Sequence, residues 1–315
     1  MENLFKKLLH RRESGIFLAL LGLMALITCF QKNFIDPNNL YLVSRQIALT
    51  AIIALGVFFV ILTGGIDLSV GSTVGLSGFI CGLTMAAGLH PLLAIMAGLA
   101  TGALVGAVNG VIVAVVGVTP FIVTLGMLGV ARGLVLVIKH GDSIREISKP
   151  FIALGNGSIF GLSSPVIMLI GLAITAHIVL KHTAFGRRVY AIGGNEEATR
   201  LSGINTRKVK FLTYVICGAL SSVTGILFVA RFQSAQADAG KGMELDAIAA
   251  TVIGGTSLMG GEGSVVGVLI GAVIMGVIRN GLVLMEVSSY WQELIIGSII
   301  VLAAILDIVR SRRRR

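Results

Sequence analysis

Apolar stretches long enough to cross a membrane recur along almost the whole chain, and they limit the folds open to it. A helix needs about 20 apolar residues to cross the hydrocarbon core of a bilayer. The candidate spans lie at 15–31, 42–63, 70–88, 91–116, 119–138, 165–181, 211–232, 245–261, 264–284 and 291–309. Hydrophobic residues make up 55% of the 315 residues, more than a soluble protein of this size could bury. We therefore expect an all-α polytopic membrane protein with about ten transmembrane helices, folded as one domain over 1–315.

Basic residues mark three segments that we expect on the same side of the membrane. Most of the 25 Lys and Arg residues lie in the N-terminus (1–14), in a long polar loop (182–210) and in the tail (310–315). Loops that stay in the cytoplasm carry an excess of Lys and Arg, and an even number of spans brings both termini to one side. We therefore expect all three segments in the cytoplasm. The net charge of +10 is then a topology signal that attracts anionic lipid, so no nucleic-acid partner is expected.

Two glycine-rich segments resemble each other and suggest a weak internal repeat. GGIDLSVGSTVGL at 64–76 is echoed by GGTSLMGGEGSVVGV at 254–268, and Asn109-Gly110 is echoed by Asn280-Gly281. Transporters built from two related halves show such repeats, although glycine-rich membrane segments can also resemble each other by chance. Backbone interrupted by glycine and polar residues is tolerated at membrane depth only inside protein or beside a watery cavity. We therefore expect broken or re-entrant helices near a translocation path.

Polar side chains at these interruptions and within the spans are candidates for lining that path. Asp67 is expected to cap a half-helix that starts at Leu68, because a carboxylate accepts hydrogen bonds from backbone N–H groups there. An ordinary cap at the rim of the membrane is the alternative. The residues predicted to line the path are Asp67, Ser69, Asn109, Thr124 and Asn280. Each of them could instead satisfy a neighbouring backbone carbonyl within the bundle.

Gly98, Gly102, Gly106 and Gly110 recur every four residues and predict a smooth helix face. Small residues let helix backbones approach closely. Packing within one subunit is the simpler interpretation, and an interface between subunits is the alternative.

The polar loop contains a short amphipathic helix by its pattern of residues. Asn195 is expected at the N-cap, carboxylates follow in the first turn where the helix dipole favours them, and Gly203 is expected to end the helix. A short helix tied to two spans can sit in a cleft on a cytoplasmic motor protein and transmit its movement, while a helix resting on lipid is the alternative. The residues predicted to couple to such a motor are Gly193, Gly194, Asn195, Glu196, Glu197, Ala198, Leu201 and Gly203.

Several long motifs, in the same order, make the chain resemble the membrane subunit of bacterial ABC sugar importers, the ribose/xylose/arabinose/galactose permease family. The resemblance covers nearly the whole length. It is carried by GGIDLSVGS (64–72), PFIVTLG (120–126), GRRVYAIGGNEEATRLSGIN (186–205), ARFQSAQ (230–236), ELDAIAATVIGGTSLMGGEGS (244–264) and NGLVL (280–284). Residues 197–203 also approximate the E-A-A-x-x-x-G pattern of such permeases, with Thr199 in place of the second Ala.

This resemblance implies a permease in the bacterial inner membrane that imports a monosaccharide with several partners. A second permease subunit, identical or paralogous, completes the pathway. ATPase subunits bind ATP and Mg²⁺ and contact the 193–204 segment, and a periplasmic binding protein delivers the sugar. Arg231 and Arg279, toward the periplasmic ends of their spans, are expected to meet acidic surfaces of that binding protein. Pairing with acidic residues such as Asp246, or snorkelling to the interface, is the alternative.

Catalytic and cofactor motifs are missing from the sequence. It has no G-K-[ST] for a Walker-type phosphate loop and no H-E-x-x-H or G-x-S-x-G, and its five histidines form no ligand cluster. We therefore expect no enzyme activity, cofactor or metal in this subunit. The resemblance leaves an ABC permease for a related small solute such as autoinducer-2 as an alternative function, and an ion-coupled secondary transporter is another. An ion-coupled transporter would need acidic or histidine relays at mid-membrane, and a membrane scaffold would need no polar interruptions.

Overall fold

The protein is described by a computed structural model that covers residues 12–312. Most of the predicted N-terminal cytoplasmic segment and the end of the predicted basic tail, 1–11 and 313–315, lie outside the described residues. Within 12–312 the chain forms thirteen α-helices, α2 to α14, and one small β-hairpin.

The helix bounds follow the apolar stretches of the sequence. They are α2 (Arg12–Phe30), α3 (Pro37–Leu62), α4 (Val70–Ala86), α5 (Pro91–Val111), α6 (Pro120–Lys139), α7 (Lys149–Asn156), α8 (Ser164–His182), α9 (Ala184–Gly194), α10 (Glu196–Leu201), α11 (Thr206–Phe232), α12 (Met243–Ile253), α13 (Val265–Leu284) and α14 (Ser289–Arg312). A 3₁₀ turn, η1 (Lys32–Ile35), precedes α3, and a π-helical turn, η2 (Ile112–Val116), extends α5. Strands β1 (Ser158–Ile159) and β2 (Leu162–Ser163) pair antiparallel before α8.

Proline fixes where many of these helices begin. All five prolines of the sequence lie in the first two positions of a helix, in α3, α5, α6, α7 and α8. Proline is tolerated there because its missing N–H would have no partner within the helix, and its fixed φ angle already suits the helix. The sequence therefore sets these N-termini locally.

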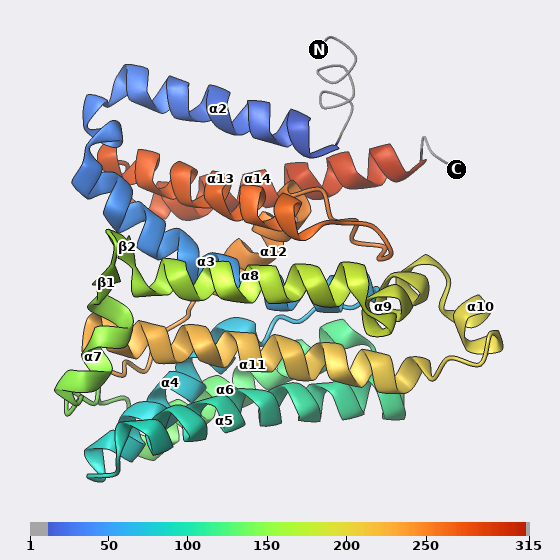
Figure 1. Ribbon diagram of the computed structural model, residues 1–315, viewed down its shortest axis with the longest axis horizontal. Helices are drawn as coiled ribbons and strands as arrows, with labels where there is room; N and C mark the ends of the chain where they lie inside the picture. The colour runs from blue at the N-terminus through green and yellow to red at the C-terminus, as the bar shows by residue number, and fades with distance from the viewer. Residues whose placement is uncertain (1–11, 313–315) are drawn as a thin grey trace.

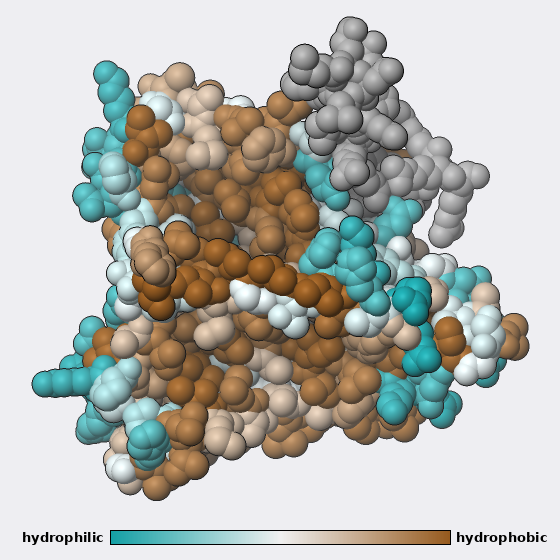
Figure 2. Space-filling view, in the orientation of Figure 1, coloured by the Kyte–Doolittle hydropathy of each residue, from teal (hydrophilic) through white to brown (hydrophobic). Residues whose placement is uncertain are grey.

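Seven helices are long and apolar enough to cross a membrane: α2, α3, α5 with η2, α6, α8, α11 and α13. α4 and residues 289–305 of α14 are shorter apolar helices. These helices run side by side (Figure 1), and the surface carries a broad apolar band between two polar ends (Figure 2). The prediction of an all-α polytopic membrane protein is confirmed. The start of α2, the end of α14 and the α9–α10 hairpin lie at one end, called here the α10 end.

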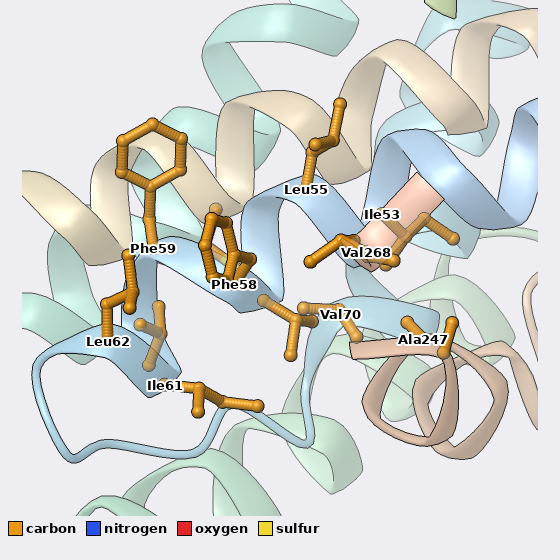
Figure 3. Packing of buried hydrophobic residues seen from close by; sticks show 14 of the residues in the cluster. Ile53, Leu55, Phe58, Phe59, Ile61, Leu62, Val70, Ala247 and Val268 are labelled. Atoms are coloured by element: carbon orange, nitrogen blue, oxygen red, sulfur yellow. The ribbon is translucent and has the colours of Figure 1, made fainter. Parts of the chain in front are cut away.

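The chain leaves the helical conformation at both glycine-rich motifs, and one predicted span is interrupted as a result. The span 245–261 is not a continuous helix: α12 ends at Ile253, and turns and extended chain follow through 254–264. Gly255, Gly260 and Gly261 adopt positive φ angles there, which side chains disfavour. Between α3 and α4 the chain is likewise extended, as Figure 3 shows between Leu62 and Val70. The predicted broken helices at both glycine-rich motifs are confirmed, and the expectation of a continuous span at 245–261 is wrong.

The two halves of the sequence echo differ in structure. Both Gly-Gly motifs follow a helix that runs toward the α10 end, and the loops they begin meet there, since the Gly261 amide donates a 3.0 Å hydrogen bond to the Leu62 carbonyl oxygen. The Asn-Gly pairs are not equivalent. Asn109 lies near the end of α5 at the α10 end, whereas Asn280 lies near the far end of α13.

Helix α3 lies at the centre of the bundle, and glycines bring α5 and α11 together beside it. Most of α3 is buried, and Phe58 and Phe59 pack with Ala247 of α12 and Val268 of α13 in one cluster (Figure 3). A side chain at Gly98 would lie only 3.1 Å from the carbonyl oxygen of Ser77. A side chain at Gly110 would lie only 2.9 Å from the carbonyl oxygen of Phe211. The glycine row of α5 therefore packs within the subunit, as the simpler interpretation predicted.

Candidate functional site

The α9–α10 hairpin projects from the α10 end of the molecule (Figure 1). Asn195 ends α9 and caps α10, and its side-chain oxygen accepts a 2.9 Å hydrogen bond from the Ala198 amide. Glu196 and Glu197 occupy the first turn of α10. Gly203, which follows the end of α10 at Leu201, has a φ of 80°. The predicted short helix, its cap and its stop are therefore confirmed.

One charged pair lies within α10 and another ties α10 to α11, while Leu201 at its end stays exposed. Glu197 pairs with Arg200 at 2.6 Å, and Glu196 pairs with Lys210 of α11. The hydrogen bond and charge of Arg200 hold the pKa of Glu197 below its usual value. Leu201 is 78% exposed, so its side chain is not used for packing inside the described chain.

Gly193 is the closest contact between this hairpin and the membrane bundle. A side chain there would collide with the Leu62 carbonyl oxygen and with the backbone of Gly260 and Gly261. The adjacent Gly194 has nothing within 4 Å of the equivalent position. Only the first of the two glycines is therefore required by close packing.

The two glycine-rich loops are the segment between α3 and α4 (63–69) and the segment between α12 and α13 (254–264). Helix α9 lies where these two loops meet. Besides the Gly193 contact, the Tyr190 hydroxyl donates a 3.0 Å hydrogen bond to the Gly263 carbonyl oxygen. The two loops are bonded to each other through Gly261 and Leu62. Helix α9 therefore packs against the end of α3 and against the chain between α12 and α13.

The predicted pathway residues in and near the loop between α3 and α4 form a buried polar cluster. Asp67 accepts hydrogen bonds from the Ser69 amide at 2.9 Å and from the Ser69 hydroxyl at 2.6 Å. Asn109 of α5 donates to the same hydroxyl at 2.9 Å. Helix α4 starts at Val70 rather than at Leu68, so Asp67 stabilises the extended segment before the helix. The predicted cap thus lies three residues ahead of the first helical residue.

Thr124 belongs to the same region, and Asn280 does not. Thr124 donates to the Ile66 carbonyl oxygen at 3.3 Å as well as to its own helix. Asn280 exchanges two hydrogen bonds with Asn39, of 3.0 and 2.9 Å, at the far end of the molecule. Asp67, Ser69, Asn109 and Thr124 are each at most 1% exposed in this conformation. Their role in lining a path stays a prediction.

Arg231 and Arg279 face a common cavity at the end opposite α10. The cavity has a volume of about 290 Å³ and is also lined by Gln46, Lys241 and Asp246. Arg279 donates to the Asp246 carboxylate at 2.7 Å, so the alternative of an internal acidic partner is confirmed for this arginine. Arg231 lies over the Phe232 ring, 5.3 Å from its centroid. The structure thus brings the two predicted docking residues together.

Two of these contacts involve residues that the sequence did not single out. Tyr190 and Asn39 are each paired with a segment far away in the chain. A tyrosine or asparagine in such positions carries no local signal, because its partner is fixed only when the helices pack.

Comparisons with known proteins agree with this architecture. A family model described as "Branched-chain amino acid transport system / permease component" matches residues 39–304. The ribose import permease protein RbsC of Escherichia coli (strain K12) is 46% identical over 299 residues, which cover 94% of this chain and 93% of that protein. The D-allose transport system permease protein AlsC of the same strain is 38% identical over 280 residues, 89% of this chain and 86% of the relative. The L-arabinose ABC transporter permease protein AraH of Azospirillum brasilense is 35% identical over 303 residues, which cover 96% of this chain and 89% of that protein.

The chain therefore belongs to the family of permease subunits of ABC importers. Within that family it falls in the branch of sugar permeases, and it is a multi-pass protein of the inner membrane. No solved structure matches the chain.

Proposed function

We propose that this subunit moves a monosaccharide across the inner membrane under the control of a separate ATPase, and that ribose is the first sugar to test. The named relatives are permeases for ribose, D-allose and L-arabinose, and the ribose permease is 46% identical to the chain, against 38% and 35% for the other two. ATP and Mg²⁺ bind to the ATPase, and this subunit carries no cofactor and no catalytic activity of its own. A second permease subunit completes the pathway.

The observation that carries the proposal is the contact of Gly193 with the Leu62 and Gly260 backbones. In the proposed mechanism the ATPase binds the exposed tip of α10, around Leu201 and the Glu197–Arg200 pair. Movement of the ATPase displaces α10, and α9 passes the displacement to both glycine-rich loops. Such a change requires that the ATPase bind the two conformations of the bundle with different affinity. This end and both termini then lie in the cytoplasm.

The opposite end receives the binding protein in this proposal. Arg231 and Arg279 share a cavity with one carboxylate, Asp246, and with Lys241, so basic groups outnumber acidic ones there. Positive charge at a docking surface steers an acidic partner and speeds its association. Sugar released by the binding protein would then enter from that end.

Reconstitution tests the proposed function. The purified chain, its ATPase and its binding protein are placed in proteoliposomes, and uptake of labelled ribose, allose and arabinose is measured with and without ATP. Uptake should require ATP and all three components. Full-speed uptake by the permease alone would instead support an ion-coupled transporter.

A substitution at the tip of α10 tests the docking of the ATPase. Leu201→Ser should weaken association with the ATPase about tenfold, the effect of losing roughly 1.4 kcal/mol of apolar contact. Because Leu201 is exposed, the substitution should change stability by less than about 0.5 kcal/mol. Ser202→Ala, also on the exposed hairpin, is the control and should bind normally. Equal affinity of the Leu201 variant and the control would remove this surface from the proposal.

A further inference from the structure

A second, larger hollow lies at the α10 end, on the flank of the bundle rather than at its tip. Its volume is about 660 Å³ and it is half open to the surroundings. The start of α2, the end of α8, helix α9 and the start of α13 all contribute to its lining. Pockets of this size accommodate small ligands. Of the residues used in the proposed coupling, Tyr190 lines it, and the exposed α10 residues Glu197, Arg200 and Leu201 do not.

Basic groups dominate the polar part of this hollow. Lys181 and Arg187 line it, together with the imidazole of His177 and the carboxylate of Glu13. Glu13 accepts a 3.0 Å hydrogen bond from the Ser264 hydroxyl. Among the side chains that the structure describes, no carboxylate forms an ion pair with Lys181 or Arg187. Two cations and one carboxylate therefore face the hollow, and neither cation is paired with that carboxylate.

Apolar side chains continue the hollow toward the membrane band. Val265 and Val266 form part of its wall. On α8, Ile174 and Ile178 are exposed on the turns that lead away from His177 and Lys181. Figure 2 shows this helix as an apolar ridge that becomes polar where it meets α9. A ligand with a charged head and an apolar tail would match both parts.

We propose that this hollow binds the headgroup of an anionic phospholipid, with its phosphate against Lys181 and Arg187 and its acyl chains along the Ile174–Ile178 face of α8. Basic pockets between transmembrane helices near the interface bind such headgroups. Arg offers paired N–H donors to phosphate oxygens, and Lys supplies a compact charge. His177 adds a hydrogen-bond donor. The lipid would bridge α8 and α13 next to Tyr190, which bonds the glycine-rich loop at Gly263.

Native mass spectrometry of the full chain tests the proposal. The protein is purified in detergent with equal amounts of phosphatidylglycerol and phosphatidylcholine of the same acyl composition, and retained lipid is counted. The test variant is Lys181→Gln/Arg187→Gln. The control is Arg188→Gln/Lys208→Gln, which removes two exposed charges that do not line the hollow. Melting temperatures establish that each variant is folded, and Lys181→Gln alone replaces the double variant if that one does not fold.

The wild type and the control should retain phosphatidylglycerol in preference to phosphatidylcholine. The double variant should lose about 30-fold of that preference, because each basic residue contributes about 1 kcal/mol and 1.4 kcal/mol is tenfold. Equal retention by the wild type and the double variant would overturn the proposal, as would an equal loss in the control. In a second arm of the experiment, glycerol 3-phosphate is added as a competitor of the bound lipid. Its failure to displace the lipid at equal concentration supports a lipid site, and full displacement would show that the site recognises phosphate alone.

Discussion

The amide of Gly261 donates a 3.0 Å hydrogen bond to the carbonyl oxygen of Leu62, and this bond joins the loops of the two glycine-rich motifs. Both loops also lie against Gly193 of α9. Three segments that are far apart in the sequence therefore meet at one point, between the exposed hairpin and the membrane bundle. In the proposed mechanism, movement of the ATPase reaches the broken helices at this point.

Gly193→Ala should separate folding from coupling. The added methyl group must displace the Leu62 carbonyl or the 260–261 backbone, and such overpacking costs about 1–3 kcal/mol. We expect ATP-dependent uptake in proteoliposomes to fall about tenfold or more. Gly194→Ala is the matched control, because a side chain there meets open space, and its uptake should stay within about twofold. Equal uptake by the two variants would contradict the proposed route of coupling.

Arg231→Glu should reduce stimulation of the ATPase by the binding protein. Reversing a charge in the cavity opposite α10 places a carboxylate where an acidic partner is expected, and like charges across an interface cost several kcal/mol. Stimulation is measured as ATP hydrolysis against binding-protein concentration, and the half-maximal concentration should rise at least about tenfold. Lys139→Glu, at an exposed position that does not line the cavity, is the control. Unchanged stimulation in the Arg231 variant would show that docking occurs elsewhere.

The Asn39–Asn280 pair allows a role in packing to be distinguished from a role in transport. Each single alanine variant should lower the free energy of unfolding by about 1–2 kcal/mol, because the remaining amide loses its partner. The double variant should cost less than the sum of the two single variants. If Asn280 only packs, both single variants should show the same uptake. A selective loss of uptake in Asn280→Ala at equal melting temperature would favour the pathway role.

Substitutions of Asp67 distinguish a structural role from a pathway role in the loop between α3 and α4. Asp67→Ala should lower the free energy of unfolding by about 1–3 kcal/mol, since the Ser69 amide and hydroxyl lose a buried acceptor. Asp67→Asn keeps one carbonyl oxygen and should cost less. A pathway role further predicts that the Asn variant loses uptake while its melting temperature stays near that of the wild type. Full uptake by folded Asp67→Asn protein would leave Asp67 with a structural role alone.

Local patterns in the sequence were sufficient for much of the fold. The apolar stretches predicted ten spans, and seven of the described helices are long and apolar enough to cross, because helices are the usual way for such segments to satisfy their backbone groups in a bilayer. Asn195, the acidic first turn and Gly203 determined α10, since caps act on neighbouring residues. The glycine-rich motifs identified both breaks. They did not show at which residue α12 would end, because an apolar run with glycines fits either a helix or extended chain.

The tertiary structure alone decided which of these local features meet. Gly193 and Gly194 look alike in the sequence, yet only Gly193 is pressed against another backbone. Asn109 and Asn280 share a dipeptide motif, but one bonds Ser69 near the α10 end and the other bonds Asn39 at the opposite end. These contacts join segments separated by many helices. Hydrophobic patterning and capping carry no information about such pairs, because each pair depends on how whole helices pack.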